Sequence, residues 1–122
     1  SVPWSVEGLK EMFHTEGYCS FLAKEEEEVI GYVGMKMVLD EADITNVAVL
    51  HSHRRKGIAR KLLKQLLEEA KKQNLHSIYL EVRASNIAAV TLYEHAGFKE
   101  VGQRKNYYDN PREDARLMLW DA

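Results

Sequence analysis

The sequence predicts an α/β fold in which one mixed, mostly antiparallel sheet carries helices on both of its faces. Three observations lead to this prediction. Three strand-like segments in succession precede a long helical pattern at residues 57–73. A further strand over 76–83 and a shorter helical pattern over 86–96 follow. Two more strand-like segments end the chain, and the order β-β-β-α-β-α-β-β is that of a single sheet whose helices bury their apolar faces against strands.

Composition and charge narrow the class of protein. The 122 residues are 45% hydrophobic and 30% charged with a net charge of −2, which is typical of an ordinary soluble globular protein rather than a general polyanion binder. We expect one domain over residues 1–122, large enough to bury roughly two-thirds of its unfolded surface. The single cysteine, Cys19, excludes an internal disulfide framework and is typical of a reducing, cytoplasmic setting. No apolar run approaches ~18 residues, so we expect no membrane span.

The N-terminal part is expected to form one short helix followed by three strands. Residues 6–14 predict the helix, with Ser5 as its N-cap because a serine hydroxyl accepts a hydrogen bond from the first turn. The acidic run from Glu25 to Glu28 indicates a solvated hairpin turn, since consecutive carboxylates cannot all converge on one metal ion. The strands are expected at residues 18–23, 29–40 and 40–50.

Two further helices are predicted by different signals. Residues 57–73 show apolar side chains at helical spacing, which predicts an amphipathic helix. The helix over 86–96 is expected to end before Gly97, because glycine readily adopts the left-handed conformation that closes a helix. The apolar stripe of the longer helix consists of Ile58, Leu62, Leu63, Leu66, Leu67 and Ala70. The last two strands are expected at 98–108 and 114–120, around a turn that contains Asn110 and Pro111.

Positive charge is concentrated immediately before the long helix. Residues 53–56 are a histidine and three cations, and small residues follow at Gly57 and Ala59. A helix start already carries partial positive charge and unpaired N–H groups, so added cations cost electrostatic energy unless an anion binds there. The small residues let a ligand approach the backbone, and the turn therefore predicts a pyrophosphate site. A solvated basic helix start is the alternative, and neither the P-loop nor the dinucleotide fingerprint is present.

Two groups of residues carry a resemblance to a known family. The segment RRKGIA resembles the Arg/Gln-x-x-Gly-x-Gly/Ala signature with which GNAT N-acetyltransferases bind the pyrophosphate of acetyl-CoA. The segment LEVRASNIAAVTLYEHAGF, followed by NYY and REDA, is similar to the RimI-like ribosomal-protein alanine N-acetyltransferases, and the likeness extends from about Pro3 to Trp120. The resemblance implies one N-terminally short acetyltransferase domain with a GNAT fold, which lacks the first strand and part of the first helix of the family.

The resemblance also implies where the co-substrate acetyl-CoA binds. In the family, the strand before the signature diverges from its neighbour and binds the pantetheine arm, much as a strand edge binds an extended peptide. Asn86 matches a residue that contacts the same arm, although asparagine at this position is also an ordinary N-cap. No metal is expected. The implied acetyl-CoA contacts are Val47, Ala48, Val49, Arg54, Arg55, Lys56, Gly57, Ile58, Ala59, Arg60 and Asn86.

Two residues are implied to carry the chemistry. Glu81, inside an otherwise apolar strand, matches the general base that takes the proton from the acceptor amine. The structural alternative for Glu81 is an ion pair with Arg83, two residues along the same strand. Tyr93 matches a phenol beside the thioester sulfur, where it would protonate the departing thiolate, and the alternative is a core aromatic side chain. A phenol pKa near 10 against a thiol pKa near 8.5 leaves the proton on the phenol at neutral pH.

The acceptor is implied by the same resemblance and by acid–base energetics. Tyr107 and Tyr108, in the turn before the last strand, match residues that line a peptide channel, with an ordinary strand-end aromatic pair as the alternative. Deprotonating a lysine at neutral pH costs ~3.5 kcal/mol more than deprotonating an α-amine, so a single carboxylate base suits a protein N-terminus. The expected acceptor is the N-terminal Ala of a small-subunit ribosomal protein, and neither nucleic acid nor membrane is expected as a partner.

Three other functions stay open at this point. A lysine or small-amine N-acetyltransferase would share the acetyl-CoA site and differ at the acceptor groove. A non-catalytic acetyl-CoA-binding module would need neither Glu81 nor Tyr93. A nucleic-acid-binding basic helix would require more basic surface and more interleaved aromatic residues than this chain has.

Overall fold

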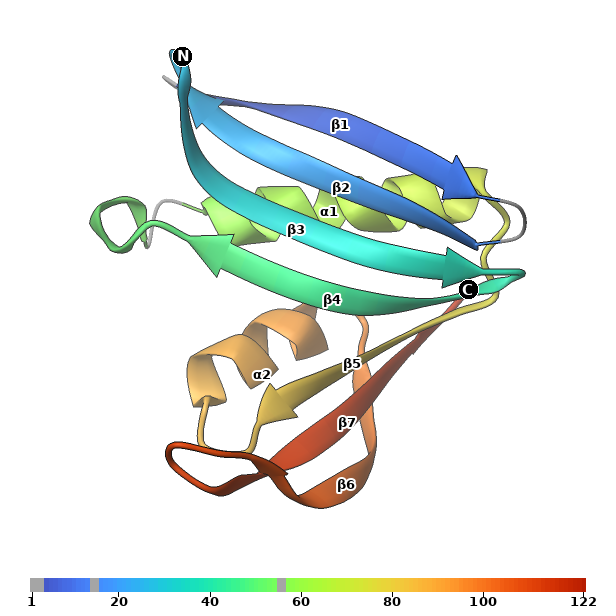
Figure 1. Ribbon diagram of the computed structural model, residues 1–122, viewed down its shortest axis with the longest axis vertical. Helices are drawn as coiled ribbons and strands as arrows, with labels where there is room; N and C mark the ends of the chain where they lie inside the picture. Colours follow the sequence, from blue (N-terminus) through green and yellow to red (C-terminus); the bar gives the residue numbers. More distant parts are fainter. Residues whose placement is uncertain (1–3, 14–15, 55–56) are drawn as a thin grey trace.

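The fold is a seven-stranded sheet with two helices, seen in a computed structural model that describes residues 4–13, 16–54 and 57–122 (Figure 1). The strands follow one another across the sheet in the order β1-β2-β3-β4-β5-β7-β6. The strands are β1 (Trp4–Phe13), β2 (Glu16–Glu25), β3 (Glu28–Val38), β4 (Glu41–Val49), β5 (Ser77–Arg83), β6 (Lys99–Tyr108) and β7 (Glu113–Asp121). The helices are the 3-10 turn η1 (His51–His53), α1 (Ile58–Lys72) and α2 (Ile87–His95). Neither α1 nor α2 is long and apolar enough to cross a membrane.

The first element is a strand and not the predicted helix over 6–14, whose last residue lies outside the described part of the chain. β1 pairs antiparallel with β2 along its whole length, which supplies hydrogen-bond partners that an isolated short helix would have to find within itself. Trp4 and Val6 are half-buried while Ser5 and Glu7 are exposed, and this alternation has the period of a strand. A glycine at position 8 also disfavours a helix by about 1 kcal/mol.

The other predicted elements are confirmed with shifts of one or two residues at their ends. The acidic run forms the turn between β2 and β3, and Cys19 is buried in the core with 1% of its surface exposed. The sheet is mixed and mostly antiparallel as predicted, because β4 and β5 run parallel while the other neighbouring strands of the described residues run antiparallel.

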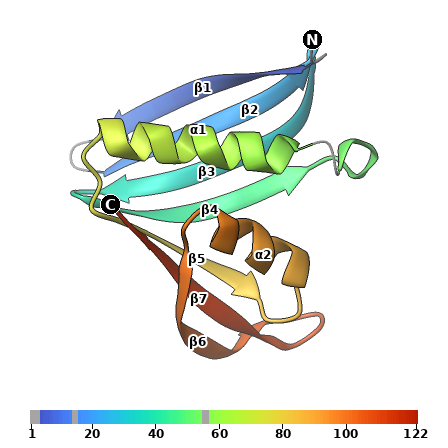
Figure 2. The same ribbon diagram turned by 180° about the vertical axis from the view of Figure 1, so that it is seen from behind.

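Helix α1 covers one face of the sheet with the predicted apolar stripe (Figure 2). Gly31 on β3 permits this close packing, since a Cβ there would lie 3.0 Å from Ile58 Cγ2 and 3.1 Å from Leu62 Cδ1. Helix α2 borders the same groove as α1.

The sheet divides between β4 and β5. These two strands pair through three residues only, from Glu41↔Ser77 to Asp43↔Tyr79, and then diverge. Both views show the resulting V-shaped opening between β4 and the β5–β7–β6 part of the sheet (Figures 1 and 2). On its other side β4 stays paired with β3 as far as Val49. The last residues of β4 therefore have a strand neighbour on one edge only.

Candidate functional site

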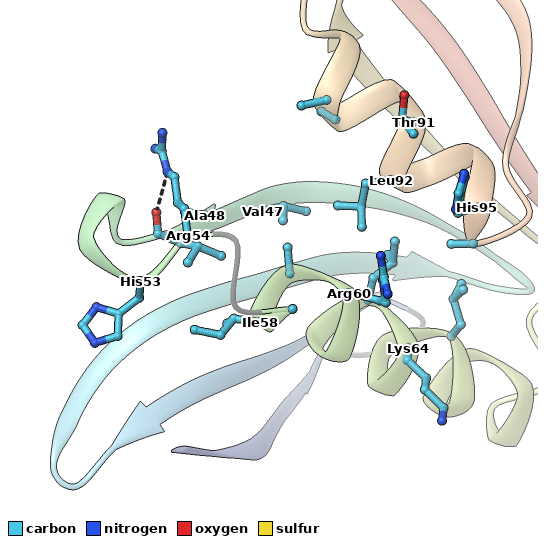
Figure 3. A pocket seen from close by; sticks show the side chains of 18 of the residues that line it. Val47, Ala48, His53, Arg54, Ile58, Arg60, Lys64, Thr91, Leu92 and His95 are labelled. Atoms are coloured by element: carbon cyan, nitrogen blue, oxygen red, sulfur yellow. Dashed lines mark hydrogen bonds between the residues drawn. The ribbon is translucent and has the colours of Figure 1, made fainter. Parts of the chain in front are cut away.

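A groove of about 1180 Å³ lies between β4, α1 and α2 (Figure 3). Cavities that hold small molecules commonly measure ~300–1,000 Å³, so this groove has room for a large ligand. Leu92 extends from α2 towards Val47 of β4, and apolar side chains of this kind form much of the wall. Eight residues that the sequence analysis assigned to acetyl-CoA line the groove: Val47, Ala48, Val49, Arg54, Gly57, Ile58, Ala59 and Arg60. Arg55 and Lys56 lie outside the described residues, and Asn86 does not line the groove.

The unpaired edge of β4 gives the groove a backbone binding surface. Beyond Asp43 this edge has separated from β5, and residues 47–49 lie in the groove wall. Backbone N–H and C=O groups at a sheet edge bind an extended amide chain by the same hydrogen bonds that join two strands. The edge can therefore hold a ligand that carries peptide-like amides.

The first turn of α1 contributes to the groove features that suit an anion. Gly57 is the N-cap with φ +78°, and the region around it is open, since a Cβ there would have no neighbour within 4 Å. The first intrahelical bond at this end runs from the Lys61 N–H to the Gly57 carbonyl at 3.0 Å. The N–H groups of residues 58–60 precede that bond and have no acceptor within the helix. With no acidic residue in this turn, its backbone and dipole suit a phosphate group.

Cations and histidines line the groove at several places along its length (Figure 3). Arg54 Nε donates to the Val49 carbonyl at 3.3 Å, and His53 Nε2 lies 3.3 Å from Glu25 Oε1. Sequence reasoning missed Lys64, Thr91 and His95, which also line the groove. Helical spacing from residues already assigned to the site could have identified these three. Lys64 lies one turn after Arg60, while Thr91 and His95 lie one turn apart on the face of α2 that starts with two alanines.

Glu81 lies outside the groove lining, in β5 two residues beyond Tyr79, the last residue of β5 that pairs with β4. Its Oε2 is 3.7 Å from Arg104 Nε, and 23% of its side chain is exposed. Arg83 pairs instead with Glu113, at 3.4 Å between Nη1 and Oε1. The sequence alternative, an ion pair between Glu81 and Arg83, is therefore wrong. A half-exposed pair such as Glu81–Arg104 is weakly held, so the carboxylate remains accessible to another partner.

Tyr93 projects from α2 into the core and retains only 7% of its surface exposure. Its ring packs edge-to-face on Phe98, with 5.7 Å between centroids. Burial, followed by the neighbouring Tyr108 phenol, raises the pKa of Tyr93 to about 12. At neutral pH the hydroxyl therefore carries its proton and can donate it.

Asn86 caps α2 as the structural alternative proposed. Its Oδ1 accepts a hydrogen bond from the Ala89 N–H at 3.2 Å. This bond satisfies one of the first N–H groups of the helix. A contact between Asn86 and acetyl-CoA stays a prediction.

Tyr107 and Tyr108 are the last two residues of β6, as the predicted strand over 98–108 and the alternative of a strand-end aromatic pair both have it. Their rings meet edge-to-face with centroids 4.9 Å apart. Burial is the main cause that raises the pKa of Tyr108, and the charges of Tyr107 and Glu81 add to it. Since Tyr108 also acts on the pKa of Tyr93, its phenol lies within electrostatic range of both Glu81 and Tyr93. These three side chains form what we call the acceptor cluster.

Comparisons with known proteins agree with this geometry. The model of the Acetyltransferase (GNAT) family matches residues 1–98. The ribosomal protein bS18-alanine N-acetyltransferase of Escherichia coli (strain K12) is 39% identical over 118 residues, which cover 95% of this chain and 79% of that protein. The crystal structure of the ribosomal-protein-S18-alanine N-acetyltransferase from Escherichia coli has a TM-score of 0.82 at 38% identity, over 90% of this chain and 71% of that chain.

A third comparison supports the fold. The crystal structure of a GNAT family acetyltransferase from Elizabethkingia anophelis with acetyl-CoA bound has a TM-score of 0.74 at 24% identity. The match covers 86% of this chain and 76% of that chain. Among the residues described for the present chain, no group of three His, Cys, Asp or Glu side chains is placed to hold a metal ion.

Proposed function

The chain belongs to the GNAT family of acetyltransferases, and from that premise we propose that it transfers the acetyl group of acetyl-CoA to the N-terminal α-amine of a protein. The observation that carries the proposal is the divergence of β4 from β5 next to a helix that starts at a glycine. It opens the groove between β4, α1 and α2, and the proposed catalytic residues Glu81 and Tyr93 lie on β5 and α2, outside the groove lining.

The residues of the groove fit acetyl-CoA part by part. The β4 edge at residues 47–49 offers backbone groups to the two amides of a pantetheine arm. The first turn of α1, with Arg54 and Arg60 beside it, offers N–H groups and positive charge to a pyrophosphate. Ala88 and Ala89 on α2 leave room for a ligand between the helices. When bound, acetyl-CoA supplies an activated acetyl group.

The acceptor cluster supplies acid–base chemistry to this reaction. Glu81 is an accessible carboxylate and accepts the proton of the acceptor amine, directly or through one water. Tyr93 donates its proton to the departing sulfur, and its raised pKa keeps that proton in place across the neutral range. Backbone N–H groups of β4 stabilise negative charge on the carbonyl oxygen as it develops. No covalent enzyme intermediate is required, because the amine attacks the thioester itself.

We infer the identity of the acceptor from the single carboxylate base and from the names of the relatives. Glu81 is the one carboxylate of the acceptor cluster, and an α-amine needs ~3.5 kcal/mol less than a lysine to lose its proton at neutral pH. The curated relatives at 39% identity are named for the alanine of ribosomal protein bS18. We therefore assign the N-terminal alanine of a small-subunit ribosomal protein as the acceptor, within a single acetyltransferase domain.

The test is acetylation of matched peptides followed by mass spectrometry. A peptide with a free N-terminal Ala and an internal lysine should gain one acetyl group at its first residue. The same peptide with a blocked N-terminus should stay unlabelled. Labelling of the lysine in the blocked peptide would overturn the α-amine assignment and would identify a lysine acetyltransferase of the same family.

A further inference from the structure

Arg83, the last residue of β5, makes more contacts with the β6–β7 turn than any role discussed so far requires. Its Nη1 donates to the Pro111 carbonyl at 3.0 Å, and its Nη2 donates to the Asp109 carbonyl at 3.2 Å. Its Nη1 also lies 3.4 Å from Glu113 Oε1. The guanidinium carbon stands 4.4 Å from the centre of the Tyr108 ring. One side chain thus holds both strand ends of this hairpin and one face of Tyr108.

The same turn is tied to the start of α2. Glu113 Oε2 accepts a hydrogen bond from the Ser85 N–H at 2.6 Å. The pKa of Glu113 is lowered by these hydrogen bonds from Ser85 and by Arg83, so the carboxylate stays charged at neutral pH. Ser85 directly precedes Asn86, the N-cap of α2. The hairpin, the Tyr108 ring and the helix that carries Tyr93 are therefore connected through Arg83 and Glu113.

We propose that Arg83 is a positioning residue for the acceptor site, which holds the Tyr108 ring in place without touching the acceptor. The inference rests on the proposed function, since it takes Tyr108 as part of the acceptor wall. Arginine suits this task because its planar fork reaches two carbonyls and a carboxylate while its face stacks on an aromatic ring. A lysine keeps the charge but cannot make this set of contacts at once.

The pair with Glu113 is not the reason for this assignment. The Arg83 side chain is 33% exposed, and ion pairs of that kind contribute little to stability. The contacts instead fix geometry, because both carbonyls belong to the turn that follows Tyr108. Loss of Arg83 should therefore change acceptor binding more than folding.

The kinetic test compares Arg83→Met and Arg83→Lys with Arg116→Met. Arg116 is a matched control, since it is 30% exposed, donates to the Ala84 carbonyl at 3.0 Å and pairs with Glu100 at 3.3 Å, with no contact to the turn. Arg83→Met should raise KM for the acceptor roughly tenfold and leave KM for acetyl-CoA within about twofold. The KM of Arg83→Lys for the acceptor should lie between the values of wild type and Arg83→Met. Arg116→Met should leave both constants near wild type.

A double-mutant cycle with Tyr108→Ala tests whether Arg83 acts through Tyr108. If it does, Arg83→Met should add little to the loss already caused by Tyr108→Ala. Additive losses, or an equal rise in KM for acetyl-CoA, would overturn the proposal. The acceptor for these assays is the peptide that the wild-type protein acetylates, so a wrong acceptor class is detected in the wild type alone.

A spectroscopic readout does not depend on any acceptor. The Tyr108 ring resonance is assigned in ¹³C-tyrosine-labelled protein by its loss in Tyr108→Phe. It should shift in Arg83→Met and stay in place in Arg116→Met. An unmoved Tyr108 resonance in a folded Arg83→Met protein would show that the ring is held by other contacts, and the inference would fail.

Discussion

The cofactor groove and the acceptor cluster are built in opposite ways. The groove takes its main parts from one stretch of chain, in which β4 leads through η1 into the first turn of α1. Its binding groups are backbone amides and apolar walls. The acceptor cluster combines Glu81 of β5, Tyr93 of α2 and Tyr108 of β6, which come from three elements far apart in the chain and influence one another electrostatically. Changes in the groove should therefore act through backbone conformation, and changes in the cluster through the chemistry of individual side chains.

This difference also explains how each region tolerates change. Many residues share the binding energy of a long groove, so one substitution there removes a part of it. A catalytic proton transfer depends on a single group in a single place, so its loss costs more. The predictions below test this contrast, in order of decreasing expected effect.

The largest effect is expected for Glu81→Gln. The amide cannot accept the amine proton, so kcat should fall about 10²–10⁴-fold while the affinity for acetyl-CoA stays close to wild type. Raising the pH should restore part of the rate, because more of the acceptor amine is already deprotonated. The control is Arg104→Gln, which removes the ion-pair partner of Glu81 and leaves the base in place. An unchanged kcat in Glu81→Gln would end the base assignment.

Tyr93→Phe tests the buried member of the acceptor cluster through the pH dependence of the unfolding free energy. The pKa of Tyr93 is raised to about 12 in the folded chain, against about 10 when unfolded. As the pH rises, the phenol ionises first in the unfolded chain. The stability that Tyr93 contributes to the folded chain is therefore complete below pH 10 and is lost as the pH rises towards 12. A difference of this size corresponds to roughly 3 kcal/mol.

The measurement is urea denaturation at several pH values between 8 and 11.5. Wild type should lose more unfolding free energy across this range than Tyr93→Phe does. Tyr18→Phe is the control, since Tyr18 is 45% exposed on the sheet, and it should follow the wild type. Parallel curves for wild type and Tyr93→Phe would contradict the raised pKa.

In the groove, Gly57→Val should act through backbone conformation. Gly57 has φ +78°, a conformation that costs a residue with a side chain roughly 1–2 kcal/mol. Valine would also block the approach to the first turn of α1, so the rise in Tm that saturating acetyl-CoA gives the wild type should disappear. Gly102→Val is the control, because a Cβ there meets only Leu117 Cδ2 at 3.9 Å. A full acetyl-CoA shift in Gly57→Val would remove this turn from the binding site.

The smallest effect is expected for Asn86, where capping and ligand contact can be separated. Asn86→Ala removes the bond to the Ala89 N–H and should lower the unfolding free energy by about 1 kcal/mol. Asn86→Ser keeps a cap, so it should retain most of that stability. If Asn86 also contacts acetyl-CoA, both variants should bind it more weakly. Binding that is equal to wild type in both would leave Asn86 as a cap alone.

Much of the fold and of the groove could be predicted because their signals are local. The apolar stripe of α1, the glycine before it and the cap of α2 are patterns within a single element. The N-terminal element was mispredicted for the opposite reason. Residues 4–13 carry a weak local pattern, and pairing with β2 decided their conformation.

The partners of charged side chains could not be predicted at all. Sequence proximity suggested that Glu81 pairs with Arg83, but Glu81 meets Arg104 of β6 and Arg83 meets the β6–β7 turn. Residues 81 and 83 point to the same face of the sheet as Arg104 of β6, which lies across β7 from them. Which of these charged side chains pair depends on the register of β5, β7 and β6.

The sequence by itself determined which residues of α1 face the core and where α1 and α2 begin and end, because periodicity and terminal residues act over a few positions. Only the tertiary structure decided that β4 and β5 separate after Asp43 and Tyr79, that both described helices flank one groove, and that Tyr108 comes near both Glu81 and Tyr93. These features depend on strand pairing and side-chain packing between segments far apart in the chain. Their energies are shared among many weak contacts, so no short stretch of sequence contains them.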